Sequence, residues 1–371
     1  MVTSAARQVP VLMEAVDSNG LLPMRRAEQA FSTAYAFRRF LQKELPRNLM
    51  EFPKPNALLD ASFPKAKPLP PGIITRWPRA SLALLNSGEN GLSEIPLDHG
   101  VPPGEIRGGS TAAQRLLRNF LRNRLPNYAD ARNEPAQQAT SELSPYLHFG
   151  HISVHQIFSE LTAQEGWSPN HLALRSTGSR SGWWGMGKDT EAFLDQVITW
   201  REIGFNICHL RNDYDQFESL PAWALKTLQH HARDERRHVY GLERFERAAT
   251  HDPLWNAAQT QLVREGRIHN YLRMLWGKKI IEWTRTPQKA VEIMLELNNK
   301  YALDGRDPNS YSGIFWCLGR YDRPWGPERP VFGTVRYMSS ENTARKFDIR
   351  EYVRKYGPSL FAGMKEYFFG K

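Results

Sequence analysis

The chain has 371 residues, enough for the core of one large or two ordinary domains. Its 49 lysines and arginines exceed its 39 aspartates and glutamates, and the net charge of +10 favours an anionic partner such as nucleic acid, with an inert basic surface as the alternative. Two cysteines, Cys208 and Cys317, exclude a disulfide framework, and the absence of a long apolar run or signal segment excludes a membrane or secreted protein, so we expect a cytoplasmic one.

The first 107 residues do not make a complete domain. Residues 9–16 (VPVLMEAV) predict a single β-strand, and residues 25–45 predict a helix with an apolar stripe at Ala30, Ala34, Phe37 and Leu41. A parallel α/β domain needs several such units, so residues 1–50 are interpreted as a truncated α/β remnant. Residues 51–107 are rich in proline and are interpreted as a connector laid over the surface.

From residue 108 to residue 371 the pattern is helical, which predicts a mostly α domain. Residues 111–124 predict an amphipathic basic helix, with an apolar face that includes Leu117 and Phe120 opposite Arg115, Arg118 and Arg122. Residues 140–150 (TSELSPYLHFG) place three hydroxyls just before a helix. Such a helix start can bind an anion because its first N–H groups lack partners. A simple N-cap explains one of the hydroxyls, and both interpretations stay open.

A helix is also predicted to begin at residue 195, with Gln196 and Trp200 on one face. An indole beside an amide can stack on one planar ring and hydrogen-bond another. The alternative is a core tryptophan next to a surface glutamine.

Residues 250–283 hold three tryptophans, Trp255, Trp276 and Trp283. Asp252 and Pro253 predict a helix start, and Gly266 predicts a break before a second helix. Trp276 and Trp283 are seven residues apart, which puts them on one helix face about 10 Å apart along the axis. Indoles at such spacing can relay an electron from the surface to a buried acceptor, and buried core aromatics are the alternative.

The last part of the chain alternates polar turns with basic, aromatic segments. Residues 301–309 predict a tight polar loop after a helix at 290–298. Residues 320–330 interleave arginine with aromatics and prolines, a composition typical of a rigid loop that touches phosphates and stacked bases. Arg345 and Lys346 extend this basic surface. No internal repeat, phosphate-binding loop or metal motif occurs, so no metal is expected.

Five blocks in this order carry a family resemblance: TSELSPYLHFG, THDPLWNAAQ, RMLWGKKIIEW, LDGRDPNSYSGIFW and DRPWG. Together they resemble the flavin domain of class II DNA photolyases, from residue 108 to about residue 355. VPVLMEAVDSNGLLP is more weakly similar to the last strand of that family's N-terminal antenna domain. The resemblance implies a helical FAD-binding and catalytic domain over residues 108–371. It also implies that most of the antenna domain is absent, so no antenna chromophore is expected.

The resemblance assigns residues to FAD. Matches to the residues around the FAD phosphates, ribityl chain and flavin ring are Tyr128, Thr140, Ser141, Leu143, Ser144, Arg273, Asp304 and Asp307. Asn298 matches the asparagine beside the flavin N5 atom. Trp276 matches the tryptophan nearest the flavin, and Trp255 and Trp283 match further members of a photoreduction chain.

It also assigns residues to UV-damaged DNA, the implied partner of a monomeric enzyme that would reach the nucleoid through DNA binding. Trp200, Met274 and Trp316 match residues that pack on a flipped-out pyrimidine pair, and Arg132, Arg323 and Arg336 match DNA-contacting arginines. The implied reaction is light-driven: excited reduced flavin donates an electron to a cyclobutane pyrimidine dimer, the ring splits and the electron returns. Cyclobutane dimers are favoured over (6-4) products by the class II similarity.

One residue departs from the family pattern. Gln196 stands where the family normally has a glutamate that hydrogen-bonds the dimer, and an amide can donate a hydrogen bond but cannot deliver a proton. Two alternatives follow. The chain could be a blue-light receptor that keeps the tryptophan chain, or a flavoenzyme acting on a small molecule.

Overall fold

The computed structural model describes residues 6–8, 12–50, 52–54, 56, 59, 62, 68–86, 88–93 and 95–357, with only the backbone of residues 89 and 90. Over these residues the chain is helical and contains no β-strand, which confirms the mostly α prediction. Two isolated bridges are the nearest approach to a sheet, Thr33 with Tyr321 and Arg329 with Gly333.

The strand predicted at the N-terminus is wrong over the part that is described. Residues 12–16 have no β pairing, Leu12 and Val16 are 87% and 84% exposed, and residues 9–11 lie outside the described residues. An extended segment needs a neighbouring strand to satisfy its N–H and C=O groups, and none is present among the described residues.

The helix predicted for residues 25–45 begins later than expected. A 3₁₀ turn, η1 (Met24–Arg26), comes first, and α2 spans Ala34–Asn48. The hydroxyl of Thr33 accepts a hydrogen bond from the Ala36 N–H and caps α2, so the helix starts there and Ala30 lies outside it, exposed.

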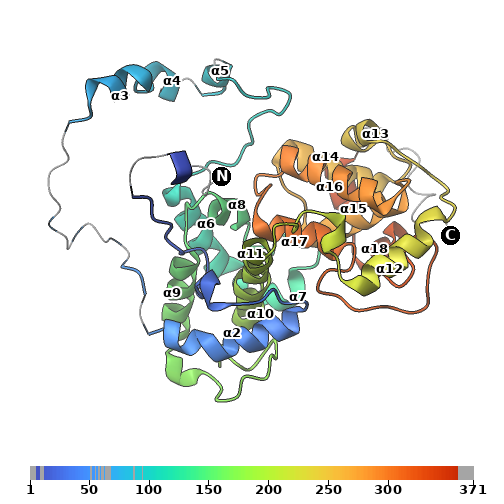
Figure 1. Cartoon of the computed structure of the whole chain (residues 1–371), viewed down its shortest axis with the longest axis horizontal. Coiled ribbons are helices and arrows are strands. Elements are labelled where there is room, and N and C mark those ends of the chain that lie inside the picture. Colours follow the sequence, from blue (N-terminus) through green and yellow to red (C-terminus); the bar gives the residue numbers. More distant parts are fainter. Residues whose placement is uncertain are drawn as a thin grey trace.

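The described parts of the predicted connector carry three short helices, of which the first two are largely exposed. They are α3 (Pro71–Arg76), α4 (Leu82–Asn86) and α5 (Glu89–Leu92). Figure 1 shows this segment as an arc away from the main body. Its apolar side chains Ile73, Trp77 and Leu85 are exposed, so it adds little to the core.

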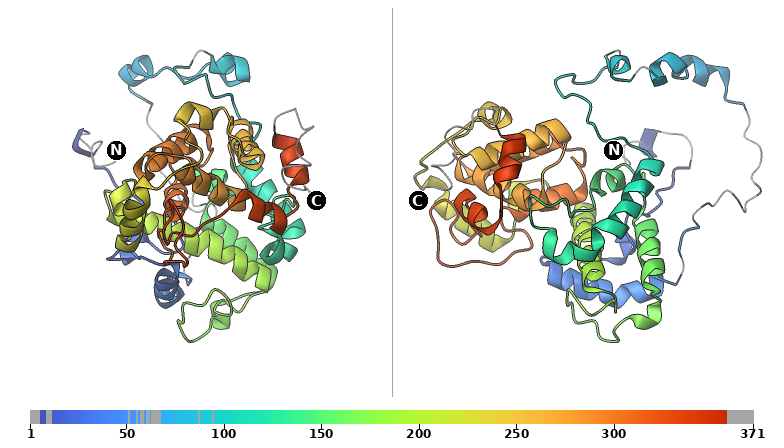
Figure 2. Two further views of the ribbon diagram at one scale, coloured as in Figure 1. Left: turned by 90° about the vertical axis from the view of Figure 1, so that its right-hand side faces the viewer. Right: turned by 180° about the vertical axis from the view of Figure 1, so that it is seen from behind.

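Two helical lobes lie side by side and form the main body, and each has its own hydrophobic core (Figures 1 and 2). The first lobe contains α2 and the elements α6 (Ser110–Asn123), η2 (Leu125–Asn127), α7 (Tyr128–Ala131), α8 (Ser144–His148), α9 (Val154–Glu165), η3 (Pro169–His171), α10 (Lys188–Leu194), η4 (Asp195–Trp200) and α11 (Arg201–Leu210). In α6 the predicted basic face is exposed at Arg115 and Arg118, while Leu117 and Phe120 are fully buried, as the pattern predicts.

The second lobe follows from residue 217 onward. It contains η5 (Phe217–Ser219), α12 (Ala222–His230), η6 (His231–Arg233), α13 (Leu242–Glu246), α14 (Pro253–Glu265), α15 (Asn270–Glu282), α16 (Pro287–Tyr301), α17 (Pro308–Trp316), α18 (Ser340–Lys346) and α19 (Arg350–Tyr356). The predicted start and break are confirmed, because Asp252 accepts from the Trp255 N–H at the start of α14 and Gly266 ends it with φ of 66°. Residues 290–298, predicted as helix, lie within α16.

Polar links and one close helix contact join the lobes. The carboxylate of Glu142 pairs with Arg267, the hydroxyl of Ser144 donates to Asp304 Oδ2 at 2.9 Å, and a ring nitrogen of His148 lies 3.2 Å from Asp307 Oδ2. Helix α11 packs on α17 at Gly204, where a Cβ atom would come within 2.9 Å of the Pro308 carbonyl oxygen. A larger residue at position 204 would therefore push the lobes apart.

Candidate functional site

A cavity with a volume of about 850 Å³ lies between the two lobes. Ligand sites typically measure about 300–1,000 Å³, so the cavity is large enough for a dinucleotide-sized cofactor. Most of the residues expected at the site line this cavity: Tyr128, Arg132, Thr140, Ser141, Leu143, Ser144, Gln196, Trp200, Arg273, Met274, Asp304, Trp316 and Arg336.

One part of the wall is a polar cradle. Ser144 donates to one oxygen of Asp304, and Arg273 Nη2 lies 3.4 Å from the other. Ser141 Oγ accepts a hydrogen bond from the Leu143 N–H at 3.4 Å. Thr140 and Ser141 precede α8 as the sequence predicts, whereas Ser144 is the first residue of the helix itself. Anion binding there stays a prediction.

Glu142 holds the cradle in shape. Its backbone has φ of 58°, unusual for a residue with a side chain, and its carboxylate bridges Arg124 at 2.9 Å and Arg267. These two ion pairs fix the turn that carries Thr140 and Ser141. Elsewhere on the cavity wall, the guanidinium of Arg132 lies 5.8 Å from the centre of the Tyr128 ring. Burial raises the pKa of the Tyr128 phenol.

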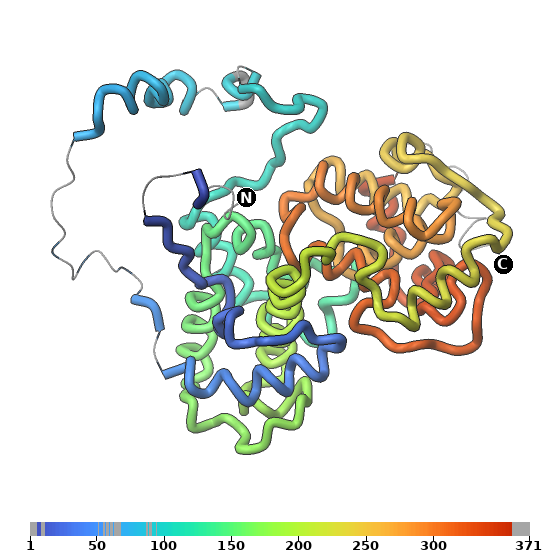
Figure 3. Tube along the Cα trace, viewed as in Figure 1, coloured from blue at the N-terminus to red at the C-terminus, as the bar shows by residue number. Residues whose placement is uncertain are grey.

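Gln196 and Trp200 come from an unusual helical turn. The run from α10 to α11 is continuous, but residues 195–200 form the π-helical turn η4, which the sequence pattern did not predict. Such turns insert one extra residue into a helix and recur at functional sites. Both side chains line the cavity. Figure 3 shows α2 running beside this region, and Arg38 Nε donates to Asp195 Oδ1 at 2.8 Å in a pair that is at least 90% buried.

The aromatic part of the wall is backed by a buried cation. Trp316 and Met274 line the cavity, and Lys278 behind them is fully buried with Nζ 5.5 Å from the centre of the Trp316 ring. Lys278 Nζ donates to the Cys317 carbonyl oxygen at 2.6 Å, and burial lowers the pKa of this amine to about 8.

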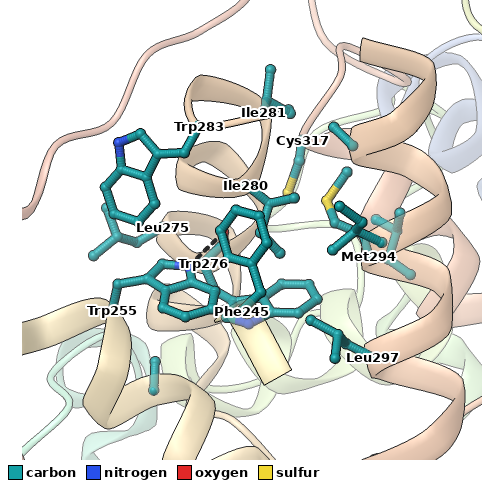
Figure 4. Close-up of a cluster of buried hydrophobic side chains, with 14 of the residues drawn as sticks. Phe245, Trp255, Leu275, Trp276, Ile280, Ile281, Trp283, Met294, Leu297 and Cys317 are labelled. Atoms are coloured by element: carbon teal, nitrogen blue, oxygen red, sulfur yellow. Dashed lines mark hydrogen bonds between the residues drawn. The ribbon is translucent and has the colours of Figure 1, made fainter. Parts of the chain in front are cut away.

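The three tryptophans of residues 250–283 are all buried behind the cavity, and none lines it. Trp276 comes shortly after Arg273 and Met274, which line the cavity from α15. Its indole N–H donates a hydrogen bond to Gln259 Oε1 at 2.8 Å. The Trp255 and Trp283 rings meet edge to face at 6.0 Å (Figure 4). Trp283 is the residue that ends α15 rather than part of the helix.

The sequence pattern missed the continuation of this tryptophan cluster toward solvent. Trp283 contacts the rings of Tyr240 at 5.9 Å and His251 at 4.8 Å, and Tyr240 Oη lies 2.8 Å from His251 Nδ1. His251 is exposed as a residue, and Tyr240 is half-buried. No feature of the sequence near Tyr240 points to Trp283, because the two are brought together only by the packing of the loop before α13 on α15.

Besides the three tryptophans, three further expected site residues lie off the cavity wall. Asn298 is buried one layer behind it, and its Nδ2 donates to Ser310 Oγ at 2.7 Å. Asp307 caps α17 by accepting from the Asn309 N–H at 2.9 Å, and its hydrogen bond raises the pKa of His148. Their roles toward a flavin stay predictions.

Arg323, the third, lies in a separate stack. Its guanidinium is 4.2 Å from the centre of the Trp325 ring, and that of Arg336 is 4.7 Å from the same ring. Since Arg336 also lines the cavity, the stack stands beside the cavity. Trp325 belongs to the DRPWG block and to the aromatic–arginine alternation, so the sequence held a signal for it.

Two features are absent from the described residues. No group of three or more histidine, cysteine, aspartate or glutamate residues is arranged to hold a metal ion. No helix in the described ranges is long and apolar enough to cross a membrane.

No model of a protein family matches this chain. Comparison with individual known proteins does find relatives, and the three described next share one name. The deoxyribodipyrimidine photo-lyase of Methanothermobacter thermautotrophicus is 41% identical over 265 residues, covering 71% of this chain and 54% of that protein. Those of Oryza sativa and Arabidopsis thaliana are 37% and 36% identical over 354 and 357 residues, covering 94% and 95% of this chain and 63% and 66% of theirs. The chain thus spans between 54% and 66% of the length of these relatives.

Solved structures agree at the level of the fold. A class III photolyase from Agrobacterium tumefaciens superposes with a TM-score of 0.57 at 19% identity, covering 91% of this chain and 61% of that one. At this identity the likeness speaks for the fold alone. Together with the sequence relatives, it shows that the chain belongs to the DNA photolyase family, among the class II-type members.

Proposed function

We propose that this chain binds FAD between its lobes and uses light to repair cyclobutane pyrimidine dimers in DNA. The observation that carries the proposal is the composition of one cavity. Its wall joins a polar cradle, built around Ser144 and Asp304, to an aromatic part with Gln196, Trp200 and Trp316. A cofactor and a planar substrate could therefore lie in contact within one cavity.

The residues present fit the flavin that the family implies. Thr140, Ser141 and Ser144 offer hydroxyls, and Arg267 and Arg273 offer positive charge for a pyrophosphate. His269 also lines the cavity, and both of its ring nitrogens are buried without a hydrogen-bond partner. Burial lowers the pKa of His269 to about 4, so the ring is neutral and can donate to one ligand atom and accept from another. Buried polar atoms without partners are rare in a protein, and a ligand would satisfy these.

When bound and reduced, FAD supplies a photoexcited electron for splitting the dimer. The protein's own share is to bind and orient the lesion. Trp200 and Trp316 offer aromatic faces and Met274 an adaptable apolar contact, so a flipped-out pyrimidine pair would exchange base stacking in the duplex for stacking in the cavity. The Gln196 amide would donate a hydrogen bond to a pyrimidine carbonyl without delivering a proton.

The surrounding charge suits a DNA partner. Arg132 and Arg336 line the cavity, and Arg323 and Arg336 stack on Trp325 beside it. A net charge of +10 adds a general attraction for phosphate. The arginines would therefore position the strand, while Trp325 offers a surface for an unpaired base.

The buried tryptophans would supply electrons to the cavity. Of the three tryptophans, Trp276 is the nearest in sequence to the residues of α15 that line the cavity. Trp255 and Trp283 follow, and Tyr240 and His251 continue the contacts from Trp283 to solvent. A hydrogen bond links Trp255 to the Trp276 backbone, and ring contacts link Trp255, Trp283 and Tyr240 with His251, so an external reductant could act at the surface. This relay would serve photoreduction of the cofactor and not lesion repair itself.

A second candidate is a photolyase-derived flavoprotein that does not repair dimers, such as a blue-light receptor or a small-molecule flavoenzyme. The observation in its favour is Gln196, which removes the carboxyl that the family normally places against the dimer. The cavity-lining arginines favour the first candidate, because a small apolar substrate would not need them.

The deciding experiment is to purify the protein, record its flavin absorption and illuminate it under reductant with an oligonucleotide containing one cyclobutane thymine dimer. Recovery of the ultraviolet absorption of intact thymine, in light and not in darkness, is the expected result. Trp200→Ala should abolish recovery while flavin remains bound, whereas Trp77→Ala, which removes a 62% exposed indole on the connector, should not. Bound flavin that photoreduces but never restores thymine would select the second candidate.

A further inference from the structure

A second, smaller cavity lies on the other side of Trp200. Its volume is about 480 Å³, and it opens between the start of α2 and the loop of residues 177–180. We call it the α2 pocket; its lining includes Thr33, Tyr35, Arg38, Ser179, Arg180 and Trp200. No carboxylate lines it, so its polar character is that of hydroxyls and guanidinium groups.

The positive end of a helix faces this pocket. Helix α2 has 15 residues, begins at the pocket with the cap residue Thr33, and carries no acidic residue in its first turn. The first N–H groups of a helix lack intrahelical partners, and the helix dipole adds a partial positive charge there. No carboxylate lines the pocket itself, although Asp195 pairs with the lining residue Arg38, so the charge at the helix start is available to a bound anion.

The side chain of Arg38 independently indicates that a hydrogen-bond acceptor is missing from this pocket. Its side chain is only 7% exposed and lines the pocket. Nε donates to Asp195 at 2.8 Å and Nη1 donates to the Gly178 carbonyl at 3.2 Å, but Nη2 is buried with no partner. A buried donor without an acceptor costs free energy, and a phosphate oxygen is the acceptor that guanidinium groups bind best.

Arg180 connects the two cavities. Its side chain lines both, as do Trp200 and Tyr321, and it is exposed. A strand that turns its lesion into the larger cavity past Trp200 would therefore bring its backbone toward Arg180 and the start of α2. The loop that carries Arg180 is held by α2, since Gln42 accepts from the Gly178 N–H at 2.7 Å and donates to the Ser179 carbonyl at 3.0 Å.

We propose that the α2 pocket binds a phosphate group, and that its source is a phosphodiester of the lesion-bearing DNA strand. Arg38 Nη2, the start of α2 and Arg180 hold this phosphate. The proposal rests on the proposed function for its DNA source, whereas the phosphate chemistry rests on the pocket alone. Because Arg38 also holds Asp195, the residue before Gln196, the bound phosphate sits next to the turn that presents the lesion-facing side chains.

The test uses lesion duplexes that each carry one neutral methylphosphonate in place of a phosphate near the dimer, titrated in darkness at several salt concentrations. For the wild-type chain, the duplex that lacks the phosphate held by the α2 pocket should bind more weakly, with the slope of log Kd against log salt lowered by about 0.9, the value of one phosphate contact. Phosphates held by other arginines should give the same effect, which Arg38→Lys leaves in place. Arg38→Lys should no longer distinguish that duplex from the unmodified one, because an ammonium cannot bind Asp195 and the phosphate together. Arg180→Gln, a change of an exposed side chain, should lower the slope by about 0.9 on unmodified lesion DNA.

Arg39→Gln is the matched control, since it removes an exposed charge from the same helix outside the pocket and should keep the position-specific effect. If Arg38→Lys and Arg180→Gln both behave as the wild type at every position, the proposal is wrong. Inorganic phosphate followed by phosphorus NMR forms the second arm. Phosphate binding that needs Arg38, without any methylphosphonate effect, would overturn the DNA source in favour of a free phosphorylated compound.

The outcomes also separate this proposal from the proposed function. A protein that repairs the dimer but shows no position-specific effect defeats the α2 pocket as a DNA site and leaves the repair function intact. A protein that does not bind lesion DNA defeats the repair function and the DNA source together. In that case the inorganic phosphate titration still tests whether the α2 pocket binds a phosphate group. Binding by the wild type that is lost in Arg38→Lys supports this claim, and absence of binding by the wild type overturns it.

Discussion

The indole N–H of Trp255 donates a hydrogen bond to the backbone carbonyl oxygen of Trp276 at 3.0 Å. This bond ties α14 to α15 at the point where the ring of Trp255 also meets Trp283 (Figure 4). All three tryptophans are core residues, and they are also linked to one another, since the Trp255 and Trp283 rings are in contact and Trp255 is hydrogen-bonded to the Trp276 backbone. The two interpretations of the sequence therefore do not exclude each other.

Trp276→Phe should slow photoreduction of the oxidised flavin several-fold, because phenylalanine fills the space but is far harder to oxidise. Repair by enzyme that has been reduced beforehand should be spared. The rate of flavin bleaching under light with an external reductant measures the effect. Trp184→Phe, a buried tryptophan of the other lobe, is the control, and equal rates in both variants would mean that the relay is misassigned.

Gln196→Glu should raise the yield of dimer repair per absorbed photon. Glutamic acid can donate a proton as well as a hydrogen bond, while the position on η4 and the lining of the cavity stay the same. The quantum yield with a dimer-containing oligonucleotide is the measurement. Gln229→Glu adds the same charge on the exposed side of α12 and should change nothing. An unchanged yield in Gln196→Glu would argue against a lesion-facing role.

Arg323→Ala should weaken binding to damaged duplex by about 1–3 kcal/mol. The substitution removes a positive charge and the guanidinium that stacks on Trp325 at 4.2 Å. Fluorescence anisotropy at fixed salt gives the affinity. Arg285→Ala, an exposed arginine in the turn between α15 and α16, controls for the loss of net charge. Equal affinities in the two variants would remove Arg323 from the DNA interface.

Glu202 should make stability depend on pH. It is buried and accepts from the Leu21 N–H at 2.8 Å, and burial raises its pKa from 4.5 to about 7. Between these values the folded state binds more protons than the unfolded state, so the stabilisation is full below pH 4.5 and is lost as the pH rises through about 7. The shift corresponds to roughly 3 kcal/mol.

Glu202→Gln should remove this dependence. Denaturant unfolding at pH 5 and at pH 8 measures it as the difference in unfolding free energy between wild type and variant, which cancels the other titrating groups. Because the amide cannot ionise, the variant should gain on the wild type at the higher pH. A difference that is the same at both pH values would show that the carboxyl does not titrate in this range.

Local signals predicted much of the fold. The structure confirms the helix start predicted at Asp252 and Pro253, the helix end predicted at Gly266 and the apolar face of α6. Each of these signals acts within one or two helical turns. The strand prediction was wrong over residues 12–16, the part of it that the structure describes, because a strand depends on a partner. The predicted start of the first helix was also wrong, because a helix start depends on its cap, here Thr33.

The site was predicted less completely, for a physical reason. The family blocks carry the lining residues, so Ser144, Trp200 and Trp316 could be expected together. The π-helical turn at 195–200, the contact of Tyr240 with Trp283 and the buried Arg38–Asp195 pair depend on segments far apart in the chain. No periodicity in a single segment contains such information.

The links between the lobes predict how a ligand in the cavity affects the unfolding of the two lobes. Glu142 with Arg267, Ser144 with Asp304 and His148 with Asp307 cross the boundary between two separately packed cores. A ligand in the cavity would touch both sides of that boundary and stabilise only the joined state. A filled cavity should therefore couple the unfolding of the two cores more tightly than the polar links and the α11–α17 contact do alone. The shape of a calorimetric trace would then report cavity occupancy without any light or DNA.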